Sequence, residues 1–218
     1  MAILRIRTVP DPVLRRKSKP IRRVDDAVRT LARNMVETLH HALGVGLAAP
    51  QVGRLQRLVV LHLPDEDDPR VLVNPEITRH EGERRVEEGC LSVPGYLGLI
   101  TRAVKVRARA VNESGARIRL SAEELFAQAL EHEVDHLDGI LYLDHLKSHE
   151  DLHEIGDDDE AQHHHDYAAE IVDSSLMKSR GEKRFLIARP DSSGGGIGEI
   201  KDEVIVQVTP GEIDRFGR

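Results

Sequence analysis

The chain has 218 residues, of which 39% are hydrophobic and 32% are charged, and its formal net charge is −7. This length suits one domain with an appendage, and the lack of any run of about 20 apolar residues excludes a membrane-spanning helix. The single cysteine, Cys90, excludes an internal disulfide framework. With no signal-peptide pattern at the N-terminus, we expect a cytoplasmic protein that acts away from the membrane.

The first half of the chain predicts one helix followed by two strands. Between residues 24 and 43, apolar side chains recur at intervals of three and four, and Gly44 ends this amphipathic pattern. Segment 44–53 is too rich in small residues for a regular element. Residues 57–64 and 71–78 are rich in branched apolar side chains, which predicts two strands separated by an acidic turn.

The next elements are a hairpin and a second helix. Residues 103–111 alternate between apolar and polar, and a turn joins them to 116–120, as in a β-hairpin. Ser121 and Glu124 have the spacing of a capping box, which predicts that a helix begins there and runs to Gly139. We therefore predict an α+β fold, with mixed or antiparallel sheets packed around a central helix.

Charge and composition change after Lys147. From there to the end, 8 Lys/Arg stand against 17 Asp/Glu. We interpret residues 1–147 as the main domain, 148–166 as an acidic, His-rich linker, and 167–218 as an extension that forms at most a β-hairpin. Residues 15–23 form a basic cluster, interpreted as a solvated loop, with attraction to RNA or another anionic surface as the alternative.

The second predicted helix carries the segment His132-Glu133-Val134-Asp135-His136. Residues four apart lie about 40° from each other around a helix, so His132 and His136 face the same way and can hold one divalent metal. Glu133 stands beside them and can reach a metal-coordinated water as a general base. The alternative is an exposed, charged helix that contains two histidines by chance.

Two ligands do not complete a catalytic site, which normally has three protein ligands. The residues that follow do not continue the motif of the best-known metallopeptidases, although Asp144 and His145 lie nearby. The other candidate is Cys90, because a thiolate is a strong metal ligand. A lone cysteine is more often buried and inert, so the choice depends on its neighbours.

Three segments in this order, GVGLAAPQ at 44–51, EGCLS at 88–92 and HEVDH at 132–136, resemble the signature motifs of peptide deformylases. The resemblance spans residues 1–147. It implies a metal-dependent hydrolase that removes the N-formyl group from the formyl-methionine of newly synthesised proteins and releases formate. A formyl-methionyl peptide is then the substrate, a transient association with the ribosome is expected, and no sequence-specific nucleic acid is involved.

The resemblance also implies roles for individual residues. Cys90, His132 and His136 would ligate the metal, commonly Fe2+, with Zn2+, Ni2+ or Co2+ as substitutes. Glu133 would be the general base. Gln51 and the backbone N–H of Leu91 would bind the oxygen on which negative charge develops.

Substrate contacts and supporting contacts follow from the same resemblance. Gly44 and Gly46 would let an extended peptide approach the backbone as an added strand, and simple turn formation is the alternative for both. A methionine pocket is implied, with Ile100, Leu125 and Leu130 as candidate lining residues. Arg102 would pair with Glu88 to support the Cys90 segment, and Glu131, where the family commonly has Gln, would face away from the metal.

The residues alone leave two other hypotheses about function. A zinc-dependent peptidase would use the same helix motif with a third His or Glu ligand. A deformylase-like fold kept only as a binding module would need no intact catalytic residues. His163, His164 and His165 could capture a stray metal ion, but a solvated linker accounts for them.

Overall fold

A computed structural model of the chain describes residues 2–64 and 66–155. The C-terminal extension expected at 167–218 lies outside the described residues. So do most of the expected linker and the three consecutive histidines at 163–165.

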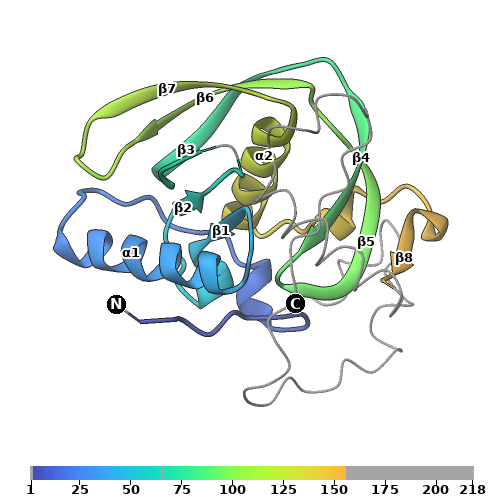
Figure 1. Cartoon of the computed structure of the whole chain (residues 1–218), viewed down its shortest axis with the longest axis horizontal. Helices are drawn as coiled ribbons and strands as arrows, with labels where there is room; N and C mark the ends of the chain where they lie inside the picture. Colours follow the sequence, from blue (N-terminus) through green and yellow to red (C-terminus); the bar gives the residue numbers. More distant parts are fainter. Residues whose placement is uncertain (1, 65, 156–218) are drawn as a thin grey trace.

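The described residues form two α-helices, eight strands and four short 3-10 helices (Figure 1). In chain order these are η1 (Pro12–Arg15), α1 (Asp26–His41), β1 (Gly46–Ala48), η2 (Ala49–Val52), β2 (Leu58–Leu61), β3 (Arg70–Glu81), β4 (Arg84–Cys90), β5 (Val93–Arg102), β6 (Lys105–Val111), β7 (Arg117–Glu123), α2 (Glu124–Asp138), η3 (Tyr142–His145), η4 (His149–Asp151) and β8 (Leu152–Glu154).

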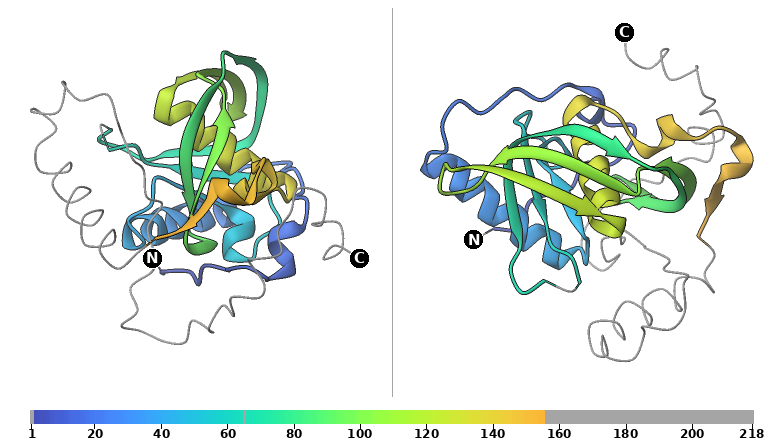
Figure 2. Two further views of the ribbon diagram at one scale, coloured as in Figure 1. Left: turned by 90° about the vertical axis from the view of Figure 1, so that its right-hand side faces the viewer. Right: turned by 90° about the horizontal axis from the view of Figure 1, so that it is seen from above.

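Two antiparallel sheets enclose α2. The five-stranded sheet has the order β1-β2-β3-β6-β7, and the three-stranded sheet has the order β4-β5-β8. Figures 1 and 2 show α2 at the centre, with the long strands on either side of it and α1 alongside β1 and β2. This arrangement confirms the predicted α+β class with a central helix.

The first helix forms where its periodicity predicts. Asp25 caps its start by accepting a hydrogen bond from the Val28 backbone N–H. Its inward face buries Thr38 and four apolar side chains, and the apolar ones pack with β1 and β2 in one cluster: Val28, Ala32, Met35 and Leu39. Burying a side chain of the size of valine, methionine or leucine stabilises a fold by about 1.5–3 kcal/mol. Neither α-helix of the described part has the length and apolar character needed to cross a membrane.

The start of α2 differs from the prediction. Ser121 does not cap the helix. It pairs with Arg107 in the β6–β7 ladder, and the strand continues to Glu123 before the helix begins at Glu124. The hairpin ladder satisfies the backbone groups that a capping box would have satisfied, so tertiary pairing overrides the local signal. The end is as predicted, with Gly139 in the left-handed conformation at φ 78°.

The second sheet was not evident from the sequence. β4 and β5 pair along residues 84–102, where no strand is predicted, because charged side chains interrupt the apolar alternation of β4. This sheet also includes residues that fall within the predicted linker. Leu152, His153 and Glu154 form β8, which pairs with β5, so the sheet continues past Lys147.

Segment 44–53, predicted to have no regular element, contains β1 and η2. β1 is an edge strand of three buried residues, paired on one side with β2. β1 also contacts α2, and these helix–strand contacts place the Gly-rich segment next to the HEVDH motif. The fold thus brings together three segments that are far apart in sequence.

Candidate metal centre

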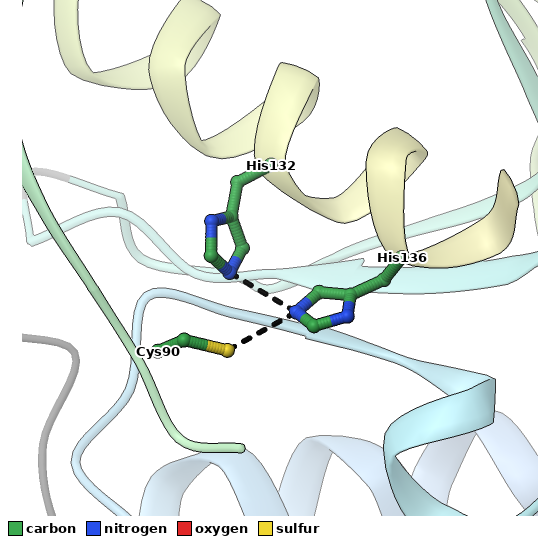
Figure 3. A group of neighbouring side chains, drawn as sticks. All are labelled: Cys90, His132 and His136. Carbon is green, nitrogen blue, oxygen red and sulfur yellow. Dashed lines mark hydrogen bonds between the residues drawn. The ribbon is translucent and has the colours of Figure 1, made fainter. Parts of the chain in front are cut away.

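Cys90, His132 and His136 converge on one point between β4 and α2 (Figure 3). The Cys90 Sγ lies 3.1 Å from His136 Nε2, and His136 Nε2 lies 3.2 Å from His132 Nε2. Their ligand atoms all lie within 4.8 Å of one another, and all three residues are buried. The two histidines come from one face of α2, as their spacing of four predicts, and Cys90 ends β4 at a register irregularity after Gly89.

Glu88 holds the His132 ring in place by a hydrogen bond to the ring nitrogen that is not directed at the cluster. Its Oε1 lies 2.5 Å from His132 Nδ1, which leaves the His132 Nε2 atom for the centre. Arg102 donates two further hydrogen bonds to the same carboxylate, at 2.7 and 3.0 Å, so the predicted Glu88–Arg102 pair is present. Burial alone would raise the pKa of Glu88, but Arg102 and His132 outweigh it and lower the pKa to about 2.

The pair belongs to a longer network that the sequence did not reveal. Arg102 also donates to Asp135 at 2.6 Å, and His145 Nε2 lies 2.8 Å from the same Asp135 oxygen. The network therefore runs from His145 near the surface to His132 in the centre. His145 is not close to the cluster, and Asp144 pairs with Arg15 at 2.5 Å. Neither candidate offered by the downstream sequence therefore joins the three converging side chains.

Glu133 is buried beside the two histidines. Its Oε2 atom has no hydrogen-bond partner in the described structure. Burial raises its pKa to about 7, opposed in part by the charge of His132. A carboxyl group with this pKa can both accept and return a proton near neutral pH.

Gly46 gives Glu133 the space that it occupies. A Cβ placed on Gly46 would lie 2.3 Å from Glu133 Oε1 and 2.9 Å from its Cδ and Cγ. Only glycine allows this approach. Gly44 is also close-packed, since its Cβ would lie 2.8 Å from Leu39 Cδ1 and 3.1 Å from Leu91 Cδ1.

Gln51 approaches the cluster from η2 with a defined amide orientation. Its Oε1 accepts a hydrogen bond from the Ala48 N–H at 2.7 Å, so its amide nitrogen must point the other way. The Nε2 atom lies 3.2 Å from Ser92 Oγ and 3.7 Å from Cys90 Sγ. The structure thus directs a hydrogen-bond donor at Cys90 in the cluster.

The remaining residues singled out from the sequence are Leu91, the three candidate pocket residues and Glu131. Leu91 is fully buried next to Cys90. The candidate pocket residues separate, because Ile100 packs in the cluster that contains Cys90 and Tyr142, whereas Leu125 and Leu130 pack in the cluster around α2 and the five-stranded sheet. Glu131 points away from the centre, as predicted, and accepts a hydrogen bond from the Ala103 N–H at 2.9 Å.

The geometry fits a divalent metal ion. One thiolate and two imidazoles are a donor set that suits zinc and the later first-row metals. The Nδ1–H group of His132 donates a hydrogen bond to the Glu88 carboxylate. Metal-ligating histidines usually have such a partner for their second ring nitrogen. The unpartnered Glu133 oxygen adds a proton acceptor beside these donors.

Comparisons with known proteins match the same part of the chain. Residues 3–151 match the family model described as Polypeptide deformylase. A protein named peptide deformylase from Dehalococcoides mccartyi (strain CBDB1) is 53% identical over 160 residues, which cover 73% of this chain and 96% of the relative. Another with that name, from Halothermothrix orenii, is 47% identical over 144 residues, covering 66% of this chain and 94% of the relative.

Solved structures give a consistent result. A peptide deformylase from Synechococcus elongatus in complex with actinonin superposes with a TM-score of 0.66 at 39% identity, covering 69% of this chain and 82% of that chain. The Thermotoga maritima peptide deformylase superposes with a TM-score of 0.65 at 36% identity, covering 68% of this chain and 100% of that chain. The family-model match contains every residue placed at the centre above.

Proposed function

Because this chain belongs to the peptide deformylase family, we propose that Cys90, His132 and His136 hold its metal ion and that Glu133 is its general base. The chain is a metal-dependent hydrolase that removes the N-formyl group from newly synthesised polypeptides and releases formate. The observation that carries the assignment of roles is the convergence of three buried ligand atoms beside a buried carboxyl group whose pKa is about 7.

The ion proposed for this site is Fe2+, with Zn2+, Ni2+ or Co2+ as substitutes. The donor set suits several of these metals, and iron is proposed from the family alone. When bound, the ion supplies Lewis acidity and makes water a stronger acid near neutral pH.

Glu133 moves the proton in the proposed mechanism. Its buried carboxylate accepts a proton from the attacking water as the carbon–oxygen bond forms at the formyl group. It then returns this proton to the leaving amine as the carbon–nitrogen bond breaks, which yields formate and a free N-terminus. The raised pKa suits both steps, because a group that titrates near neutral pH can take and give a proton with little cost.

Gln51 and Leu91 stabilise the developing negative charge. The Gln51 amide nitrogen is directed at the centre because its oxygen is held by the Ala48 N–H. The Leu91 backbone N–H lies next to Cys90 in the chain and is the second proposed donor. Hydrogen-bond donors that are fixed before the reaction stabilise such a charge without further reorganisation.

Gly44 and Gly46 are proposed to border the substrate. β1 begins at Gly46 and is an edge strand, so an extended formyl-methionyl peptide can add to it through backbone hydrogen bonds. This supports the proposed role of the glycines in binding, in addition to the space that Gly46 provides for Glu133.

The catalytic unit is proposed to extend to about residue 155, with the acidic segment after it acting outside the chemistry. We further propose a cytoplasmic enzyme that contacts the ribosome transiently. Four side chains of the basic cluster are exposed and form no ion pair within the described part of the chain: Arg16, Lys19, Arg22 and Arg23. Such residues can attract RNA phosphates, and co-sedimentation with ribosomes that weakens with salt would test this contact.

A formate-release assay tests the proposed roles. The protein is purified without oxygen, its metal content is measured, and formate release from formyl-Met-Ala-Ser is compared for wild type, Glu133→Ala and Cys90→Ala. We expect Glu133→Ala to keep its metal and lose turnover, and Cys90→Ala to lose both.

The two alternative hypotheses, a zinc-dependent peptidase and a binding module, predict different results in this assay. A Cys90→Ala protein that kept its metal and cleaved internal peptide bonds would favour a peptidase with another third ligand. A metal-loaded wild type that released no formate would favour a binding module. The complete donor set and the placed base argue against both.

A further inference from the structure

A second pair of histidines lies at the surface, outside the catalytic centre. His40 is in the last turn of α1, and His62 follows β2 directly. Their nearest ring nitrogens, His40 Nε2 and His62 Nδ1, are 2.8 Å apart, and the ring centroids are 4.9 Å apart. His40 is exposed and His62 is half-buried, so the pair is accessible to small ions.

The backbone fixes which His62 nitrogen carries a proton. His62 Nε2 lies 2.9 Å from the Glu66 carbonyl oxygen, which can only accept a hydrogen bond. Nε2 must therefore be the protonated nitrogen, and Nδ1 turns its lone pair toward His40. A ring that donates one nitrogen to a carbonyl and offers the other is the usual form of a metal-ligating histidine.

The surroundings favour the neutral form of the His40 ring, and a carboxylate lies one helical turn before it. Burial and the neighbouring His62 lower the pKa of His40, and Glu37 opposes this in part. Glu37 precedes His40 by three residues, so both lie on the same face of α1. Glu66 is not available in the same way, because its carboxylate forms a bidentate pair with Arg70.

We propose that His40 and His62, with the Glu37 carboxylate, form a second site for a divalent metal of the zinc or nickel type. Two imidazole nitrogens bound to one ion at 2.0–2.1 Å stand about 3.3 Å apart in tetrahedral geometry. The catalytic histidines already lie at 3.2 Å, and the surface pair reaches this separation by a small turn of the exposed His40 ring. Binding needs the His40 proton to move from Nε2 to Nδ1, by exchange with water.

The position of the site gives the bound ion a structural effect. The His62 backbone N–H donates to the Val45 carbonyl oxygen at 2.8 Å, and Leu43 holds a positive φ of 52° in the turn after α1. An ion between His40 and His62 therefore closes the turn that leads from α1 into β1. Since an ion that binds only the folded chain stabilises it, binding raises the melting temperature.

Zinc titration of the full-length protein tests the proposal. The catalytic centre is first loaded with Ni2+, and the tail histidines are replaced together (His163→Ala, His164→Ala, His165→Ala) so that they cannot compete. Zn2+ binding is then measured by calorimetry, with metal analysis to check that nickel is retained. We expect one additional Zn2+ equivalent and a higher melting temperature.

Four further single replacements in this background test which of these residues bind the ion. His40→Ala and His62→Ala should each weaken Zn2+ binding by at least about ten-fold, Glu37→Gln by about ten-fold, and His41→Ala, the matched neighbour, should leave it unchanged. The proposal is overturned if no additional equivalent binds, or if the equivalent survives His40→Ala. Loss of binding in His41→Ala would also overturn it, and unchanged binding in Glu37→Gln would remove the carboxylate from the site.

Discussion

Two pairs of histidines in this chain hold their nitrogens at similar separations in opposite surroundings. His132 and His136 lie 3.2 Å apart, are buried, and come from one helix. His40 and His62 lie 2.8 Å apart, are accessible, and come from a helix and the end of a strand. The distance between nitrogens alone therefore does not distinguish a catalytic centre from a peripheral site.

The two histidine pairs differ in the residues that surround them. Cys90 places a third buried donor atom beside the first pair, Glu88 lies 2.5 Å from His132 Nδ1, and the buried Glu133 has a pKa of about 7. In the second pair, His62 Nε2 is hydrogen-bonded to the Glu66 carbonyl oxygen, and the two rings are accessible to solvent. Because burial raises the pKa of a carboxyl group, the buried pair has beside it a carboxylate that titrates near neutral pH.

The largest expected effect comes from removing this base. Glu133→Gln keeps the shape of the side chain but cannot accept a proton, so kcat should fall by about 10²–10⁴-fold. Metal content should stay the same, since the three ligands are untouched. The matched surface replacement, Glu83→Gln, lies in the exposed turn between β3 and β4 and should leave kcat unchanged. Equal losses in both variants would contradict the proposed base.

Burial of Glu133 should also appear in the stability of the metal-free protein. The folded pKa is about 7 and the ordinary value is 4.5, so between these values the folded chain keeps a proton that the unfolded chain has lost. Stability should therefore fall as pH rises through this window, by about 3 kcal/mol in all.

Glu133→Gln should lack this fall, because its side chain is neutral at every pH. Denaturant unfolding of chelator-treated wild type and variant between pH 4.5 and 8 measures the difference. The variant should become the more stable protein above about pH 7. Parallel stability curves would mean that Glu133 is not desolvated in solution.

The space at Gly46 should matter nearly as much as the base. In Gly46→Ala the new Cβ would meet Glu133 Oε1 at 2.3 Å, so the carboxylate must move. A displacement of about 1 Å at a reacting group can cost about 10²-fold in rate. Kinetics on a formyl-peptide should show a kcat loss with metal retained. In the control, Gly115→Ala in the turn between β6 and β7, the new Cβ meets nothing within 4 Å and only the φ of 87° is strained, so kcat should be unchanged. A comparable loss there would point to general damage to the fold.

The Glu88 carboxylate, which is hydrogen-bonded to His132, should contribute to metal affinity. Glu88→Gln weakens the hydrogen bond to His132 and leaves Asp135 as the remaining carboxylate that pairs with Arg102, so metal affinity should fall by about 10–100-fold. Competition with a chelator measures this. The neighbour Glu87, whose contact with His153 is at the surface, provides the control Glu87→Gln, which should bind metal as wild type does. Unchanged affinity in Glu88→Gln would remove it as a positioning residue.

The smallest effect is expected from the C-terminal segment. Truncation after Ile155 should leave activity on a short formyl-peptide unchanged, because every catalytic group lies before it. Truncation after Lys147 also removes β8 and the Arg85–Asp151 pair, and should lower stability by about 1–3 kcal/mol through the loss of Leu152 packing. Thermal melting of the two proteins tests this, and equal melting temperatures would show that β8 does not support the sheet.

Local patterns predicted a large share of the fold and of the centre. The periodicity of α1, the alternation of β6 and the glycine at the end of α2 are properties of neighbouring residues, and each appears in the structure. The same holds for His132 and His136, since a spacing of four on a helix places them side by side. Ser121 shows where local reasoning fails, because a competing strand ladder used the residues that would have capped the helix.

The sequence by itself determined which residues are proposed as ligands and base and which helix carries most of them, because these proposals depend on short-range spacing and on motifs that resemble a known family. Only the tertiary structure decided that Cys90 meets the helix, that Gly46 makes room for Glu133, and that His145 and Asp135 extend the network behind His132. It also decided that His40 meets His62. The physical reason is the same in each case: these contacts join residues far apart in the chain, and their energies depend on burial, which exists only after the sheets have closed around α2.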